Sequence, residues 1–119
     1  YNSSNKAVRS FLFDSQSDQV LIGGHFFTIH TYTYYDPSDV TFAENIASYS
    51  RTSGWQSIGA GAKGSRYGQV NAMLQLSDGT IVVGGWFSQF DGVASSNIAF
   101  FGEEPVEGDL DIYLPLIVR

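Results

Sequence analysis

The chain has no cysteine and few positive charges, and each shortage excludes a class of function. Without cysteine it can form no disulfide, no thiolate metal site and no cysteine nucleophile. Only 6 Lys and Arg stand against 12 Asp and Glu in 119 residues, which gives a formal net charge of −6. Because binding to phosphates depends on clustered Lys and Arg, this composition argues against a nucleic-acid partner.

Long apolar runs and helical periodicity are missing as well. No apolar run approaches the ~18 residues that a membrane-spanning helix needs, so no membrane span is expected. No window of ~11 residues keeps the apolar spacing of a helix. Aromatic residues make up 15% of the chain, and there are 13 Gly. This composition is typical of an all-β protein with many turns.

The clearest pattern lies in residues 70–101, which predict three strands in succession. Residues 70–76 alternate between apolar and polar, as in a strand with one buried face. A tight Ser-Asp-Gly turn at 77–79 follows, because Asp-Gly tolerates the positive φ angles of short hairpins. The β-branched run at 80–87 predicts burial on both faces. A second Asp-Gly turn leads to a third strand at 97–101.

The same pattern occurs earlier in the chain. The Gly-Gly pair at 23–24 recurs 61 residues later at 84–85, and Asn-Ile-Ala at 45–47 recurs 52 residues later at 97–99. The difference is an insertion of 9 residues within segment 30–42. Such self-similarity predicts a repeat architecture, in which each unit buries its faces against a neighbour. The paired glycines predict a close approach by another backbone or a bulky side chain.

These motifs carry a family resemblance. DGTIVVGGWF, then NIA with an aromatic residue, and the linker GWQSIGAG at 54–61 resemble the Kelch-like or WD-like propeller blades of secreted bacterial proteins, a pattern that the cortical-marker propellers of fungi share. The resemblance implies four-stranded β-blades at 7–61 and 68–101, with Trp55 as a core anchor between them. Two blades cannot close a propeller of about 4–8 blades. We therefore expect an all-β fold of two propeller-like blade repeats, open or completed by neighbouring subunits, with a β-sandwich as the alternative.

The composition changes after residue 101. Residues 1–101 are expected to hold the two repeats, and residues 102–111 a solvated acidic linker. Five carboxylates in this linker leave calcium open as an alternative, although the spacing of a twelve-residue calcium loop is absent. No other metal or cofactor is expected.

Residues 112–119 are expected to form a C-terminal β-strand. DIYLPLIVR is similar to the short Y-L-P-L-V-x-R terminus of secreted proteins from Chloroflexota-like bacteria. The segment takes the fourth-strand position of the second repeat, so it either completes that repeat or is donated to a neighbouring subunit. The residues expected to make this assembly contact are Ile112, Tyr113, Leu114, Leu116, Ile117 and Val118.

A carbohydrate-binding face is the competing functional prediction. The insertion carries Tyr32, Tyr34 and Tyr35, which together with Trp86 could stack on sugars. Cross-strand aromatic packing within a sheet would explain the same tyrosines.

The inventory of reactive groups does not favour an enzyme. The carboxylates fall in predicted turns and in the acidic linker, and the two His lie in one stretch, so no acid–base pair or nucleophile is indicated. Few Lys, many Tyr, Ser, Thr and Asn, and a start at Tyr1 favour an exported protein. Whether the chain is a mature protein or a piece of a longer one stays open.

The function expected is therefore a non-enzymatic structural or adhesive protein, extracellular or on the cell surface. Copies of the chain would associate with one another as subunits of a surface filament or layer. The alternatives are a lectin-like module that binds cell-surface glycans and a fragment of a larger secreted propeller.

Overall fold

The structure, a computed structural model, describes residues 6–31, 39–65 and 67–102 of the chain. These residues form strands and turns and no helix, so the all-β prediction is confirmed. The strands are β1 (Ala7–Asp14), β2 (Gln19–His25), β3 (Thr28–Thr31), β4 (Asp39–Phe42), β5 (Ile46–Ser50), β6 (Gly54–Ser57), β7 (Ala62–Lys63), β8 (Gln69–Gln75), β9 (Ile81–Trp86), β10 (Gln89–Phe90), β11 (Val93–Ala94) and β12 (Ile98–Phe101).

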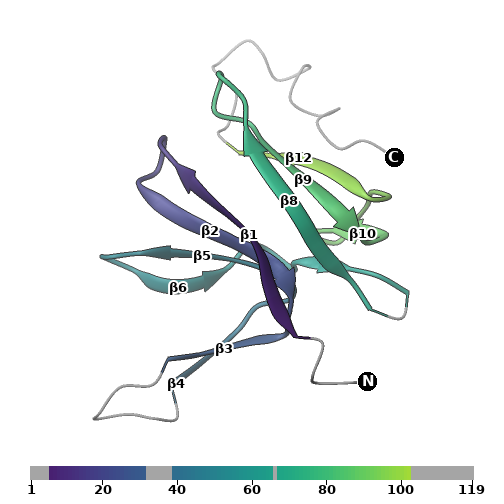
Figure 1. Cartoon of the computed structure of the whole chain (residues 1–119), viewed down its shortest axis with the longest axis horizontal. Coiled ribbons are helices and arrows are strands. Elements are labelled where there is room, and N and C mark those ends of the chain that lie inside the picture. The colour runs from purple at the N-terminus through teal and green to yellow at the C-terminus, as the bar shows by residue number, and fades with distance from the viewer. Residues whose placement is uncertain (1–5, 32–38, 66, 103–119) are drawn as a thin grey trace.

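Two larger antiparallel sheets organise the molecule (Figure 1). Sheet A has four strands in the order β1-β2-β5-β6, and sheet B has three in the order β8-β9-β12. A two-stranded hairpin, β3-β4, lies between β2 and β5 in the chain, and a small sheet joins β7, β10 and β11. None of these sheets is closed on itself.

The strands predicted at 70–76, 80–87 and 97–101 correspond to β8, β9 and β12, with ends that differ by one residue or less. The turn at 77–79 has Gly79 at a φ of 95° and a hydrogen bond from the Thr80 amide to Asp78 Oδ1 at 2.9 Å. Of the segment 30–42 that holds the insertion, the described residues 30–31 and 39–42 lie in the paired strands β3 and β4. The short strands β7, β10 and β11 escaped prediction because two residues are too few to show an alternation.

Sheets A and B share the same pairing register. Each contains one irregularity, between Val8 and Ser10 in β1 and between Val70 and Ala72 in β8. The irregularities face Gly24 and Gly85, where a side chain would collide with the backbone of the adjacent strand. The predicted close approach by another backbone is therefore present at both glycines.

The Asn-Ile-Ala motif plays the same role in both sheets. Asn45 and Asn97 have left-handed φ angles of 68° and 69°, a conformation that Asn tolerates better than most residues. Their carbonyl oxygens accept hydrogen bonds from the amides of Gly24 at 3.0 Å and Gly85 at 3.1 Å. Each asparagine thus sets the start of a strand, β5 or β12, against the glycine pair.

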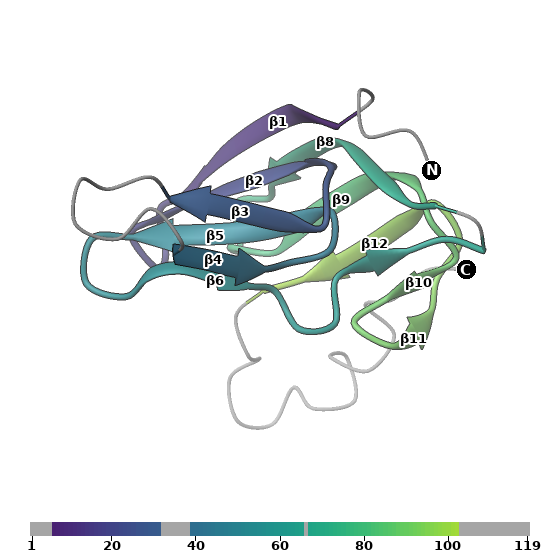
Figure 2. The same cartoon turned by 90° about the horizontal axis from the view of Figure 1, so that it is seen from below.

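The two sheets pack against each other through one face each, which we call their inner faces. Strands β1 and β2 contact β8, and β1 and β8 lie side by side (Figure 2). The core between the sheets contains Leu21, Ile46, Ala62, Val70, Ile81, Val83, Phe87, Phe90 and Ala99. Two side chains link the sheets by a polar contact, because Gln75 Nε2 donates to Asp14 Oδ1 at 2.7 Å.

A second apolar cluster lies on the other face of sheet A, under the hairpin β3-β4. It contains Ile22, Phe26, Ala43 and Ala47, with Trp55 packed against it. Trp55 therefore does not anchor the core between the repeats, and that prediction is wrong. Its strand β6 pairs with β5 so that the ring lies 5.1 Å from that of Tyr49, which points away from sheet B.

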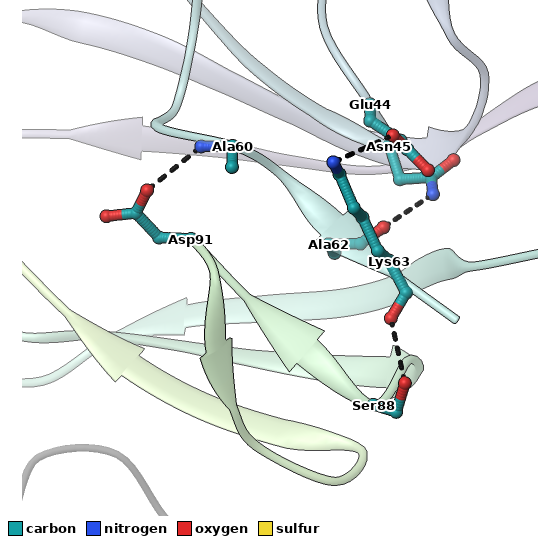
Figure 3. Close-up of polar contacts among 7 residues, drawn as sticks. All are labelled: Glu44, Asn45, Ala60, Ala62, Lys63, Ser88 and Asp91. Carbon is teal, nitrogen blue, oxygen red and sulfur yellow. Dashed lines mark hydrogen bonds and ion pairs between the residues drawn. The ribbon is translucent and has the colours of Figure 1, made fainter. Parts of the chain in front are cut away.

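The segment between the two sheets is held from both sides (Figure 3). From the first repeat, Asn45 Nδ2 donates to the Ala62 carbonyl at 2.7 Å. From the second, Asp91 Oδ1 accepts from the Ala60 amide at 2.9 Å, and Ser88 Oγ donates to the Lys63 carbonyl at 3.4 Å. These bonds fix how sheet B sits on sheet A.

Several predictions fall on residues that the structure does not describe. They are the tyrosine cluster at 32–35, the acidic linker apart from its first residue, and the C-terminal strand at 112–119. In the described part of the chain no helix is long and apolar enough to cross a membrane.

Candidate functional site

The shared register gives the residues of β1, β2 and β5 in sheet A counterparts in sheet B. Residues of β1 correspond to those 62 positions later in β8, residues of β2 to those 61 later in β9, and residues of β5 to those 52 later in β12. Under this correspondence the inner face of sheet B matches the face of sheet A that points away from sheet B. We call the faces that point away from the contact the outer faces.

The outer face of sheet A is apolar and largely open. Its two central rows are Phe11–Ile22–Ala47 and Phe13–Val20–Tyr49–Trp55. Phe11 is 72% exposed and Phe13 is 57% exposed. The inner face of sheet B, at the equivalent rows Met73–Val83–Ala99 and Gln75–Ile81–Phe101, belongs to the core between the sheets. Ile22 and Ala47 are buried under the hairpin β3-β4, as Val83 and Ala99 are in the core. The other four residues with equivalents in sheet B are exposed where those equivalents are buried or half-buried, and they are Phe11, Phe13, Val20 and Tyr49.

The outer face of sheet B repeats this relation. Its rows are Leu74–Val82–Phe100 and Ala72–Gly84–Ile98, and Leu74 is 52% exposed. The equivalent residues on the inner face of sheet A include Leu12, Leu21 and Ile46, which pack into the core. The run at 80–87 was predicted to be buried on both faces, but its buried residues Ile81, Val83 and Phe87 belong to the core between the sheets, and Val82 on the outer face is half-buried. That part of the prediction is wrong for the isolated chain.

Gly23 in sheet A and its counterpart Gly84 in sheet B show the difference between a covered and an open position most clearly. A side chain at Gly23 would collide with Val70 Cγ1, because Val70 of sheet B packs onto Gly23 of sheet A. The counterpart of Gly23 is Gly84, where a Cβ would meet only the Asn97 carbonyl oxygen at 3.9 Å. The counterpart of Val70 is Val8, which is 45% exposed on the outer face of sheet A. The chain therefore holds one filled valine–glycine contact and the two separate halves of a second.

A groove deepens the outer face of sheet A. It has a volume of about 420 Å³ and lies between β1, the hairpin β3-β4 and β6. Its lining is mostly apolar and comprises Lys6, Ala7, Val8, Phe11, Ile22, Phe26, Thr28, Ile29 and Trp55. An apolar groove of this kind suits an apolar protein surface better than a charged ligand.

The predicted carbohydrate site is described only in part. Trp86 is 58% exposed at the end of β9, and its ring lies 6.1 Å from that of Tyr67, which is also exposed. Tyr67 in turn lies 5.2 Å from the ring of buried His25. The other predicted members, Tyr32, Tyr34 and Tyr35, lie outside the described residues, as do the predicted assembly residues of the C-terminal strand.

The two histidines have structural partners. His25 Nδ1 lies 2.9 Å from the Gly68 carbonyl, and His30 Nε2 lies 3.2 Å from Thr28 Oγ1. Within residues 6–31, 39–65 and 67–102 no group of three or more His, Asp or Glu is arranged to hold a metal ion.

Asp14 is a carboxylate at the contact between the sheets. Burial raises the pKa of Asp14. Hydrogen bonds from Ser17 Oγ, from Gln75 Nε2 and from the amides of Gln16 and Ser17 together lower it by more, so the pKa lies below its usual value. The charged form of Asp14 is therefore stabilised by the fold.

No protein-family model, no curated protein and no solved structure matches the chain. The outer faces are the feature that sequence reasoning missed. A signal for them was present, since β9 is apolar on both faces while a chain with two sheets can cover only one face of each.

Proposed function

We propose that this chain is a non-enzymatic structural protein, extracellular or on the cell surface, whose two propeller-like blade repeats associate with those of other copies. Such copies would form the subunits of a surface filament or layer. The observation that carries the proposal is the open outer face of sheet A, whose equivalent in sheet B is part of the core. Contiguous apolar surface that a chain leaves uncovered is typical of a protein–protein contact.

The geometry favours blade-like repeats over a closed β-sandwich. In a sandwich the inner faces pair with each other and the outer faces are polar. Here the central rows of both outer faces carry no charged residue, and Phe11, Phe13 and Leu74 point outward. A stack of repeats, in which each sheet is covered on both faces, accounts for this composition.

The free edge of sheet B supports the predicted role of the C-terminal strand. Sheet A has β6 beside β5, whereas no described strand lies beside β12 on the equivalent side. We propose that Ile112–Val118 fills this position in its own chain or in a neighbour. Deleting residues 111–119 tests this: loss of association with an unchanged circular dichroism spectrum supports donation, and unfolding indicates a strand of its own sheet. Unchanged folding and association would contradict both.

Sedimentation velocity over a range of concentrations tests the proposed function. The expected result is a mass above 13.0 kDa that rises with concentration. A compact monomer of 13.0 kDa at every concentration would contradict self-association and leave a monomeric β-sandwich as the better description.

Glycan binding is a second candidate, favoured by the exposed pair Trp86 and Tyr67. Aromatic rings held apart from the core offer the apolar faces on which sugars stack. A Trp55→Phe chain keeps Trp86 as its single Trp, so its fluorescence reports on this site. A change in that emission with a glycan, lost in Tyr67→Ala, would support the candidate, and indifference to a broad glycan panel would contradict it.

A further inference from the structure

We infer that copies of this chain join head to tail, with the outer face of sheet B of one copy packed on the outer face of sheet A of the next. This inference rests on the proposed self-association and names its interface. It commits to a second copy of this chain as the partner that covers each outer face.

The contact between sheets A and B inside the chain is the template. There, the inner face of sheet A, with Leu12, Leu21 and Ile46, packs on the inner face of sheet B, with Val83 and Ala99. The outer face of sheet B carries Leu74, Val82 and Ile98 at the positions of the first set. The outer face of sheet A carries Ile22 and Ala47 at the positions of the second. The two outer faces therefore carry apolar residues, in the same register, at these positions of two faces that already pack together, although Ile22 and Ala47 are themselves covered by the hairpin β3-β4.

The valine–glycine contact gives the pairing its direction. In the template, Val70 of sheet B fills the space over Gly23 of sheet A. In the contact between copies, Val8 of one chain would fill the space over Gly84 of the next. A contact between two outer faces of sheet A would place Val8 without a facing glycine, and a contact between two outer faces of sheet B would leave both Gly84 spaces empty. Close packing therefore favours the mixed pairing, because empty space forfeits van der Waals contacts.

Such a contact would join the copies into either a filament or a closed ring. A contact between two different faces is heterologous, so it produces a ring if the rotation per subunit closes and a filament if it does not. Each chain adds two sheets, so a ring with the usual 4–8 blades would need about 2–4 copies. The assembly in either form buries every outer face except those at an open end.

Two single substitutions block one face each. Phe11→Asp places a carboxylate on the outer face of sheet A, and Leu74→Asp places one on the outer face of sheet B. Both side chains are more than half exposed in the single chain, so each variant is expected to fold with the circular dichroism spectrum of the parent. Burying an unpaired carboxylate in the contact is expected to weaken association by about 100-fold.

Mixing the variants tests the direction of the contact. Each variant alone is expected to sediment as a monomer. An equimolar mixture is expected to form a dimer and nothing larger, because Phe11→Asp retains the outer face of sheet B and Leu74→Asp retains that of sheet A. Sedimentation velocity of the two variants, the mixture and the parent chain gives all four masses.

The other outcomes separate the inference from the proposed function. If Leu74→Asp alone dimerises, the contact joins two copies of the outer face of sheet A, and if Phe11→Asp alone dimerises, it joins two copies of that of sheet B. Either result, or a mixture without a dimer, overturns the head-to-tail contact while the parent still associates. A monomeric parent chain overturns the proposed function itself.

Discussion

Gly23 and Gly84 occupy the same position in two sheets of the same register, yet one lies under a valine and the other is open. The residues around them are alike, so the difference does not come from the local sequence. It comes from the place of each sheet in the chain, because sheet B covers the inner face of sheet A, whereas no described strand covers the equivalent face of sheet B. This difference between equivalent positions supports the proposal that neighbouring copies cover the outer face of each repeat.

The open positions keep the apolar side chains of the covered ones. Burying one Phe or Leu side chain contributes about 1.5–3 kcal/mol, and this free energy is left unused at Phe11, Phe13 and Leu74 in a single chain. Matched substitutions at equivalent positions measure how far the two sheets differ.

The largest difference is expected for the isoleucines of the Asn-Ile-Ala motif. Ile46 is fully buried in the core, whereas its counterpart Ile98 is half-buried on an outer face. Ile46→Ala is expected to lower the free energy of unfolding by about 4 kcal/mol, and Ile98→Ala by about 1 kcal/mol. Urea unfolding of both variants at a concentration where the chain is monomeric measures the two losses. Equal losses would show that the two faces are equally covered.

The glycine pair should give the next largest difference. Gly23→Val introduces methyl groups where Val70 already lies, so it is expected to lower the free energy of unfolding by about 3 kcal/mol. Gly84→Val finds open space in a strand that favours β-branched residues, so its stability should match or exceed that of the parent. Thermal unfolding compares the two variants. A folded, fully stable Gly23→Val chain would contradict the packing described for Val70.

The asparagines provide a third comparison, in which glycine preserves the left-handed backbone. Asn45 is buried, and its side chain accepts from the Phe26 amide at 2.9 Å and donates to the Ala62 carbonyl at 2.7 Å. Asn45→Gly is expected to cost about 2 kcal/mol, because it leaves buried backbone groups without partners. Asn97 is exposed, so Asn97→Gly should cost about 0.5 kcal/mol. Urea unfolding at one pH again gives both values, and the opposite order would exclude the role given to Asn45.

The smallest effect is a dependence on pH. Asp14 has a lowered pKa in the folded chain, so its contribution to stability is present above its unfolded pKa of about 3.9 and is lost as the pH falls through the folded pKa. Its counterpart in sheet B is Leu76, which does not titrate. The melting temperature of the parent should therefore fall more steeply below about pH 4 than that of Asp14→Asn. If the melting temperatures of the parent and of Asp14→Asn fell equally with pH, Asp14 would not contribute to the pH dependence of stability.

Much of the architecture was predictable from the sequence. The glycine pairs at 23–24 and 84–85 and the Asn-Ile-Ala motifs marked corresponding strands correctly, because each has a backbone role that few other residues fill. The Asp-Gly turn at 77–79 was predictable for the same reason.

The sequence did not allow us to predict which faces of the two sheets are covered within the chain. An apolar run shows that a strand face avoids water, but it does not show whether the same chain or another copy covers it. Trp55 illustrates the limit, since it was expected to anchor the core between the repeats, while its pairing opposite Tyr49 places it on the outer face. The side on which a residue lies is set by register, and a change of one position reverses it.

The central claim is that the outer face of sheet B binds the outer face of sheet A of another copy, with Val8 over Gly84. The most direct measurement is the sedimentation mass of Gly84→Val beside that of the parent chain over the same range of concentrations. The expected result is that the parent associates while Gly84→Val stays folded at about 13.0 kDa, since the added methyl groups fill the space that Val8 needs. Association of Gly84→Val to the same extent as the parent would contradict it.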